Sequence, residues 1–390
     1  MSKSAPHSGI AGVAASLWAA GARLRVRLYE TGLLRQERLR ASVISIGNIS
    51  WGGTGKTPFT IWLAGRLQAR GLRVSILTRG YGRTSRERVK ILPPGTSPKA
   101  ALADGDEVQL YLRHLNLPIG IASSRHEAGK LLEEKFPVDV HLLDDGFQHL
   151  RLARNLDLVL VDAANPWGGS PGFHPSTSEC AGDPGWPTLL REGPSSLRRA
   201  HAILLTRCEL ATGTSNNHSA LESLQATVRR FNPDAPCFMV RTKILHFADF
   251  QGANPLPVKE FVGRRPLAFC ALGNPRNFFG MLEGAGIEVI AKKVFPDHHR
   301  YNGKDLASLA KMAQENRADC LITTEKDIVN LPSTAASSLP LYWAAIEPAV
   351  EDEDRLLNWI WERLHPPSGL LPVVTKSQAG IQQPHFAGGV

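Results

Sequence analysis

The chain has 390 residues, of which 43% are hydrophobic and 21% are charged. This composition excludes a disordered protein and indicates a folded one with room for two domains. Its 45 basic and 36 acidic residues give a formal net charge of +9, which favours an anionic partner: a nucleotide, a phosphorylated substrate, a nucleic acid or an acidic membrane. The five cysteines are widely spaced and form no C-x-x-C pair, so we expect a reducing compartment and neither a disulfide framework nor a zinc site. No apolar run reaches the ~18 residues that a membrane-spanning helix needs.

The N-terminal region predicts an amphipathic helix. Apolar residues recur at helical spacing between residues 10 and 28, and Trp18 is among them. Arginines lie within and after this stripe: Arg23, Arg25, Arg27, Arg35, Arg38 and Arg40. An apolar stripe with a tryptophan, flanked by arginines, suits a helix that lies in the headgroup region of a membrane. Packing on the core of the protein itself is the alternative. A cleaved export signal is not expected, because its basic residues would precede the apolar part.

The segment 50–58 predicts a phosphate-binding loop. It follows the apolar run 43–46 and precedes the amphipathic segment 59–70, and this order of strand, glycine-rich loop and helix is the context that such a loop needs. Backbone N–H groups and the helix N-terminus would bind phosphate oxygens, Lys56 would add a positive charge, and Thr57 would offer a hydroxyl to Mg²⁺. The predicted nucleotide-binding residues are Gly52, Gly53, Thr54, Gly55, Lys56 and Thr57. Ser50 stands where the strict motif has its first glycine, so an ordinary glycine-rich turn is the alternative.

Further apolar runs follow this loop and are separated by helical patterns. We expect strands over 73–77, 138–143, 156–161 and 202–205, and helices over 108–114 and 126–134. Strands that alternate with helices predict an α/β fold of the P-loop NTPase type, with a parallel sheet and helices on both of its faces. A Gly/Pro-rich stretch, 164–187, interrupts the pattern and predicts a long loop, either a substrate lid or a surface insertion.

Two acidic groups in this part of the chain are candidates for chemistry. Asp144 and Asp145 end an apolar strand, as expected of the acidic partner of a phosphate loop that holds Mg²⁺; a solvated acidic turn is the alternative. Asp106 begins a helical stretch. Phosphoryl transfer to a hydroxyl needs a base or an orienting group near the acceptor, and Asp106 is a candidate for that role, although a helix cap is the simpler interpretation.

A second block begins near residue 235. We expect strands over 237–245, 267–271, 286–290, 320–323 and 341–345 with helices between them, which together predict a smaller α/β domain. The adjacent His298 and His299 follow a strand-like run, 289–294. A histidine can orient a carboxylate or relay its protons. Histidines that serve only the loop, or that bind a metal, are the alternatives.

Taken together, these segments resemble the tetraacyldisaccharide 4′-kinases, the lipid A 4′-kinases of Gram-negative bacteria. The matching motifs are ordered along most of the chain: the arginine-rich N-terminal helix, 47–48, 52–58, 79–82, 105–107, 144–149, 273–275, 295–299 and 323–327. The sequence DDGFQH at 144–149 together with GGTGKTP at 52–58 is highly specific, whereas a phosphate loop alone would not be.

The resemblance implies ATP-dependent phosphorylation of the 4′-hydroxyl of lipid A disaccharide 1-phosphate in lipid A (lipopolysaccharide) biosynthesis, with ATP and Mg²⁺ as cofactors. It implies a peripheral enzyme at the cytoplasmic face of the bacterial inner membrane. Neither a nucleic-acid partner nor an obligate protein partner is expected. We expect a membrane-associated N-terminal region at 1–42, a kinase core at 43–234, a smaller C-terminal α/β domain at 235–365 and a flexible tail at 366–390.

The same resemblance implies a role for each matching residue. Lys56 would hold the β- and γ-phosphates. Asp106, helped by His298, would accept or orient the proton of the attacking hydroxyl. The implied metal ligands are Thr57, Asp144 and Asp145. Because His298 belongs to the second block, closure of the two domains would assemble the pair when both substrates are bound, and would exclude water.

Two features depart from the family or leave alternatives open. Glu192 lies in a stretch that differs from the family pattern, so no role is assigned to it. The segment 206–209 resembles the guanine-reading motif only loosely, and we infer no guanine specificity from it.

The alternatives to a kinase are a nucleotide-dependent switch or metallochaperone, and a basic nucleic-acid-binding ATPase. The second would need aromatic residues interleaved with basic ones, but only 7% of the residues are aromatic.

Overall fold

The computed structural model describes residues 21, 24–51, 53–167, 190–211, 217–250, 254–332 and 339–365. Several expectations fall outside the described residues: those for Gly52, for most of the N-terminal apolar stripe, for residues 168–187 of the long loop, and for the 366–390 tail. Within the described ranges, no helix combines the length and the apolar character needed to cross a membrane.

The first block is built from strands that alternate with helices. The strands are β1 (Ser42–Asn48), β2 (Val74–Thr78), β3 (Val89–Leu92), β4 (Ile119–Ala122), β5 (Val140–Asp144), β6 (Leu156–Asp162) and β7 (Ala202–Thr206). The helices are α2 (Lys56–Ala69), α3 (Asp106–His114), α4 (Arg125–Lys135), α5 (Cys208–Ala211) and α6 (Asn217–Phe231). Strand β1 pairs in parallel with β5 and β6, and β3, at the edge, runs antiparallel to its neighbour β4. The predicted α/β fold with a mainly parallel sheet is confirmed.

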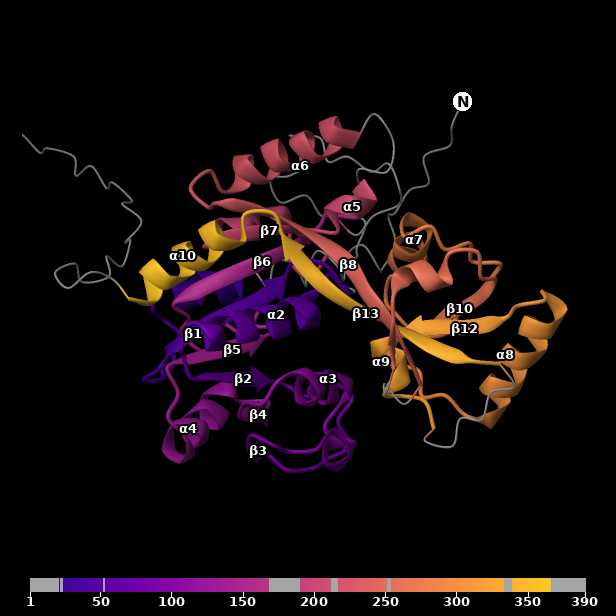
Figure 1. Cartoon of the computed structure of the whole chain (residues 1–390). Helices are drawn as coiled ribbons and strands as arrows, with labels where there is room; N and C mark the ends of the chain where they lie inside the picture. The colour runs from indigo at the N-terminus through magenta and orange to yellow at the C-terminus, as the bar shows by residue number, and fades with distance from the viewer. Residues whose placement is uncertain are drawn as a thin grey trace, which may run out of the picture.

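The second block continues the same sheet. Its strands are β8 (Cys237–Asp249), β9 (Pro255–Leu256), β10 (Pro266–Cys270), β11 (Ala291–Val294), β12 (Cys320–Thr324) and β13 (Leu341–Val350). Its helices are α7 (Pro275–Gly284), α8 (Gly303–Glu315), α9 (Glu325–Ile328) and α10 (Glu353–Leu364). In the described part of the chain the sheet has 13 strands, in the order β11-β10-β12-β13-β8-β7-β6-β1-β5-β2-β4-β3 with β9 paired to β8. The two long antiparallel strands β8 and β13 join the blocks and cross between them in Figure 1.

Helices cover both faces of the first block's sheet, because residues of each strand alternate between two cores. In β6, Leu156, Leu158 and Leu160 pack in one core with α2 and α10, whereas Val159 and Val161 pack in another with α6. Such a period of two is what a strand buried on both faces requires. Figure 1 shows the same layers, with α6 on one side of the sheet and α2 and α10 on the other.

The second block has its own cores, which follow the same rule. In β10, Leu267 and Phe269 pack with α8, and Ala268 and Cys270 pack with α7. The last helix, α10, returns to the first block, where its buried residues join the core around α2. The predicted boundary between two domains at residue 235 stays a prediction. Helix α10 follows that boundary in the sequence but packs against the core of the first block.

One expected strand is wrong. Residues 287–290 form no strand, and β11 begins only at Ala291. Gly286 has a φ of +76° in the turn after α7, so the chain is still leaving that turn where the apolar residues begin. The strands β8 and β13 also extend beyond the expected ranges, to Asp249 and Val350. Their continuation is what joins the two blocks.

Candidate active site

The carboxyl ends of β1, β5, β6 and β7 lie at one edge of the sheet, because these strands are parallel neighbours. The predicted phosphate loop follows β1 there, and helix α2 begins at Lys56. Gly55, the N-cap, has a φ of +87°, a conformation that a residue with a Cβ rarely adopts, and no side chain caps the helix. The first N–H groups of α2 are therefore available to an anion.

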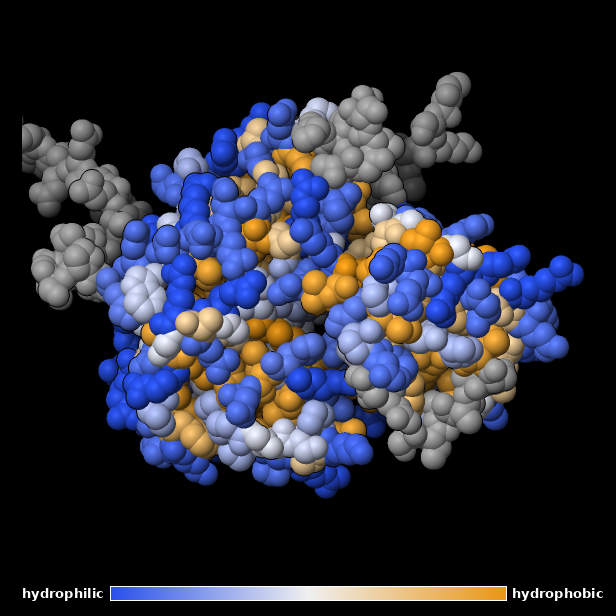
Figure 2. Space-filling view, in the orientation of Figure 1, coloured by the Kyte–Doolittle hydropathy of each residue, from blue (hydrophilic) through white to orange (hydrophobic). Residues whose placement is uncertain are grey.

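A cavity of about 1210 Å³ lies above this edge, between the two blocks. Gly53, Thr54, Gly55, Lys56 and Thr57 form part of its wall, which also includes residues of α3, α7, α9, β8 and β13. Figure 2 shows the surface hollowed between the blocks, with hydrophobic residues gathered beside the hollow. The volume exceeds the usual range for one small ligand, about 300–1,000 Å³, and leaves room for a nucleotide and part of a second substrate.

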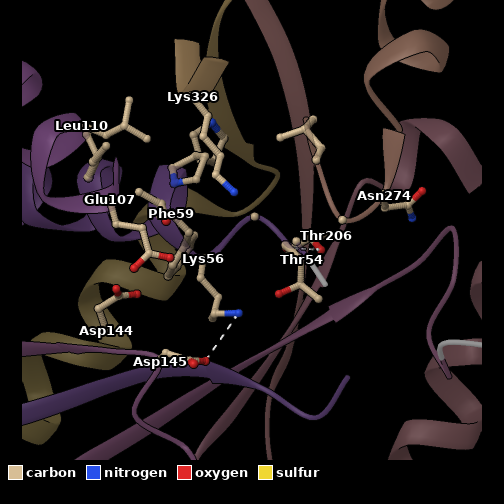
Figure 3. Close-up of a pocket in the computed structure, with 18 of the residues that line it drawn as sticks. Thr54, Lys56, Phe59, Glu107, Leu110, Asp144, Asp145, Thr206, Asn274 and Lys326 are labelled. Atoms are coloured by element: carbon tan, nitrogen blue, oxygen red, sulfur yellow. Dashed lines mark hydrogen bonds and ion pairs between the residues drawn. The ribbon is translucent and has the colours of Figure 1, made fainter. Parts of the chain in front are cut away.

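Lys56 and Asp145 meet on the floor of this cavity. The Nζ of Lys56 lies 3.5 Å from Asp145 Oδ1, the contact that is drawn as a dashed line in Figure 3. Arg191 Nη1 donates to both oxygens of Asp145 at 2.6 and 2.7 Å. Burial opposes ionisation of Asp145, but the charges of Lys56 and Arg191 outweigh it and hold its pKa below the usual value. Asp145 is therefore an anion that both cations hold in place.

Asp144, the neighbouring carboxylate, has a different environment. It is buried, its Oδ2 accepts a hydrogen bond from Thr78 Oγ1 at 3.3 Å, and its Oδ1 has no hydrogen-bond partner among the described residues. Burial, followed by the charge of Asp145, raises its pKa. An orphaned carboxylate oxygen at the wall of a cavity that Thr57 also lines fits a hard cation such as Mg²⁺, which keeps several waters and substrate oxygens as ligands. No group of three or more His, Cys, Asp or Glu side chains arranged as a metal site occurs in the described part of the chain.

The predicted pair of Asp106 and His298 is brought together. His298 Nδ1 lies 2.9 Å from Asp106 Oδ2, and Asn330 Nδ2 donates to the same oxygen at 3.2 Å. Burial opposes ionisation of Asp106, but these hydrogen bonds outweigh it and lower its pKa. His298 adopts a φ of +60°, and its ring lies 4.9 Å from that of Tyr81. The pair sits beside the cavity, where the first residue of α3 meets a loop of the second block.

The two adjacent histidines do not share a ligand. His299 Nε2 contacts Asp305 Oδ2 at 3.0 Å, whereas His298 contacts Asp106. His299 therefore serves its own block, and a joint metal site at these two residues is not supported.

Glu107 is a site residue that the sequence interpretation missed. Figure 3 shows its carboxylate beside Asp144, facing the cavity together with Lys56. Burial, followed by the charge of Asp144, raises the pKa of Glu107 to about 8. Its position next to Asp106 could have indicated a site residue. An acidic residue in the first turn of a helix, however, also stabilises the helix N-terminus without any other role.

Arg191 was missed as well. Besides binding Asp145, its guanidinium lies over the Trp51 ring, 4.8 Å from the centroid. Its neighbour Glu192, to which no role was assigned, forms an ion pair with Arg199. The local sequence does not show that Arg191 belongs to the site and Glu192 does not. The difference lies in their partners, Asp145 and Arg199, which only the fold brings near.

The phosphate loop at the end of β1, the acidic end of β5 and the surrounding parallel sheet define a P-loop nucleotide-binding protein. A family model described as tetraacyldisaccharide-1-P 4′-kinase matches residues 11–365. The chain belongs to this family, so it is a kinase that uses ATP, and the resemblance inferred from the motifs is confirmed. Membership does not favour the alternative of a switch or metallochaperone.

Relatives and a solved structure agree. The tetraacyldisaccharide 4′-kinase of Syntrophobacter fumaroxidans is 38% identical over 299 residues, which cover 76% of this chain and 74% of the relative. That of Syntrophus aciditrophicus is 33% identical over 354 residues, which cover 88% and 90%. The crystal structure of LpxK from Aquifex aeolicus in complex with ATP matches with a TM-score of 0.63 at 25% identity, and covers 90% of this chain and 97% of that one.

Proposed function

We propose that this protein transfers the γ-phosphoryl group of ATP to the 4′-hydroxyl of a tetraacyldisaccharide 1-phosphate, the precursor of lipid A. The observation that carries the proposal is the position of two sets of groups on one cavity. The phosphate loop forms one part of its wall, and His298, bonded to Asp106, comes to it from the other block.

The nucleotide phosphates would lie on the loop. The uncapped N-terminus of α2 and the backbone amides of the loop would bind phosphate oxygens. Lys56, whose Nζ lies 3.5 Å from Asp145 Oδ1, would direct its charge to the β- and γ-phosphates. Thr57, Asp144 and Asp145 would hold Mg²⁺, and the orphaned Oδ1 of Asp144 supports a place for it there. When bound, this ion would neutralise charge on the transferring phosphoryl group.

The acceptor hydroxyl would be oriented by Asp106. A carboxylate with a lowered pKa is ionised near neutral pH but is a weak base, so Asp106 would orient the hydroxyl and take up its proton as the new O–P bond forms. His298 Nδ1 bonds the same carboxylate and would hold it in place and pass the proton on. The hydroxyl oxygen then forms its bond to the γ-phosphorus as the bond to the ADP oxygen breaks, and the proton stays with the pair until it reaches solvent.

The lipid acceptor places the enzyme at a membrane surface. We infer a peripheral position at the cytoplasmic face of the bacterial inner membrane, through the region 1–42. Two exposed leucines in the described part of this region support the inference: Leu24 is 58% and Leu33 is 76% exposed to solvent. Exposed leucines beside arginines suit a membrane interface, where the leucines contact acyl chains and the arginines contact headgroups. Expectations of no nucleic-acid and no obligate protein partner remain predictions.

An ATP assay with detergent-solubilised tetraacyldisaccharide 1-phosphate tests the proposal. Lys56→Ala and Asp106→Ala should each abolish the phosphorylated lipid. Full activity of Asp106→Ala would remove that residue from the mechanism. Equal activity on the disaccharide 1-phosphate without acyl chains would contradict the assignment of a lipid substrate.

A further inference from the structure

Backbone strain singles out one residue that the proposed reaction does not use. Among the described residues, four that are not glycine have a φ in the left-handed region: Asp145 (+50°), Arg207 (+58°), His298 (+60°) and Arg317 (+54°). Such residues persist where the surrounding structure holds them, and they gather at functional sites. Asp145 and His298 belong to the proposed site, and Arg317 lies in the turn that ends α8. Arg207 follows β7 directly and lines the same cavity.

The guanidinium of Arg207 is held on three sides. Its Nη1 lies 2.5 Å from Asp162 Oδ2 at the end of β6, and its Nη2 donates to the backbone carbonyl of Gly53 in the phosphate loop. The third side is Asn277 of α7: with its amide assigned so that the oxygen faces the donors around it, that oxygen accepts from Nη1 at 2.6 Å and from Nε at 3.2 Å. The side chains of Arg207 and Asp162 are only 13% and 5% exposed, so this contact is largely shielded from water.

The neighbouring residue holds the next carbonyl of the loop. Thr206 Oγ1 donates to the backbone oxygen of Thr54 at 3.0 Å. Two consecutive carbonyls, those of Gly53 and Thr54, are thus bonded to the end of β7. In a trans peptide the C=O and N–H groups point in opposite directions, so fixing these carbonyls turns the N–H groups of Thr54 and Gly55 the other way. Neither N–H donates to a group in the described part of the chain.

We propose that Arg207 is a positioning residue that keeps the phosphate loop in its binding conformation, by holding the Gly53 carbonyl so that the loop amides face the β-phosphate. Thr206 does the same for the Thr54 carbonyl. Asp162 and Asn277 fix the guanidinium from β6 and from the second block. Glu209, the acidic residue of the same segment, accepts from the backbone N–H of Thr242 at 3.0 Å. The side chains of Thr206, Arg207 and Glu209 therefore bond backbone groups of the protein. This agrees with the sequence analysis, which inferred no guanine specificity from the segment.

The inference rests on the proposed placement of the nucleotide phosphates on this loop, so its test measures binding and not phosphoryl transfer. Calorimetric titrations of the full chain in detergent, with Mg²⁺ and either ADP or AMP, compare wild type with Arg207→Ala. We expect Arg207→Ala to bind ADP about tenfold more weakly, which corresponds to about 1.4 kcal/mol. AMP affinity should be unchanged, because AMP lacks the β-phosphate that the loop amides would hold.

Two milder variants keep the test decisive if Arg207→Ala folds poorly. Arg207→Lys should recover part of the ADP affinity, because a single ammonium reaches Asp162 or the Gly53 carbonyl without the fork that joins them. Thr206→Val keeps the shape of the side chain, removes its hydroxyl and should weaken ADP but not AMP. Arg73→Ala is the matched control: Arg73 pairs with Asp139 at the start of β2, far from the carboxyl edge of the sheet, and should bind both nucleotides as wild type does.

Wild-type ADP affinity in folded Arg207→Ala, together with weakened ADP binding in Lys56→Ala, overturns the inference and leaves the proposed function in place. Equal weakening of ADP and AMP also overturns it, because the effect would then not concern the β-phosphate. Unchanged ADP binding in Lys56→Ala overturns the placement of the phosphates itself.

Discussion

Asp106 and His298 are 192 positions apart in the chain, yet Oδ2 of the first lies 2.9 Å from Nδ1 of the second. The contact joins the first turn of α3 in one block to a loop of the other block. It lies beside a cavity whose wall includes the phosphate loop. The Asp106–His298 pair, which could take a proton from an acceptor hydroxyl, therefore forms only when the two blocks lie in this relative position.

Asp106→Asn is expected to lower kcat by about 10²–10⁴-fold, the usual contribution of a general base, with little change in the KM for ATP. The amide keeps the size of the side chain but cannot accept the proton as a carboxylate does. Steady-state kinetics with both substrates measures the two constants. Asp305→Asn is the matched control, because Asp305 bonds the neighbouring His299 away from the cavity, and it should keep wild-type kcat. A loss confined to the KM for ATP would contradict the role of Asp106.

Glu107 should make stability depend on pH. Its pKa is raised from the ordinary value of 4.5 to about 8, so between these values the folded state binds more protons than the unfolded state. The free energy of unfolding must then fall as pH rises through this window, by at most about 1.4 kcal/mol per pH unit from this group. Glu107→Gln should flatten the profile that urea unfolding gives between pH 5 and 8. Glu283→Gln, at an exposed ion pair, should leave the slope unchanged, and an unchanged slope in Glu107→Gln would refute the prediction.

Arg191→Met should weaken ATP use. Without Arg191, Asp145 keeps Lys56 as its remaining cationic partner, so Lys56 is drawn from the phosphates. Hydrogen bonds to charged groups contribute about 1.5–3 kcal/mol each, and we expect kcat/KM for ATP to fall by about tenfold or more. Arg198→Met, which removes an exposed contact to Glu30, is the control. Equal kinetics for the two variants would exclude a role of Arg191 in the site.

Ile360→Ala should destabilise the first block although residue 360 lies near the end of the described chain. Ile360 is fully buried in the core that α10 shares with α2. Truncation of a buried isoleucine costs about 2–5 kcal/mol, which denaturant unfolding can measure. The exposed Glu362→Ala in the same helix should cost far less. Equal, small losses in both variants would mean that α10 does not pack on this core in solution.

Much of the fold and part of the site could be predicted because their signals are local. The strand, glycine-rich loop and helix around Lys56 are adjacent in sequence, and Asp144 follows an apolar strand directly. The pairing of β8 with β13 joins residues about a hundred positions apart, and no local pattern encodes it. Arg191 was missed for the same reason, since its importance lies in reaching Asp145 across the fold. Asp106 and His298 were paired only through the resemblance to a family; their spacing alone left each with a simpler interpretation.

The most direct measurement follows the γ-phosphoryl group of labelled ATP, with and without detergent-solubilised tetraacyldisaccharide 1-phosphate, and locates the label in the product. The proposed function predicts label on the 4′-oxygen of the disaccharide, slow ATP hydrolysis without the acceptor, and loss of transfer in Asp106→Asn. ATP hydrolysis at the same rate with and without acceptor, with all label released as inorganic phosphate, would contradict it.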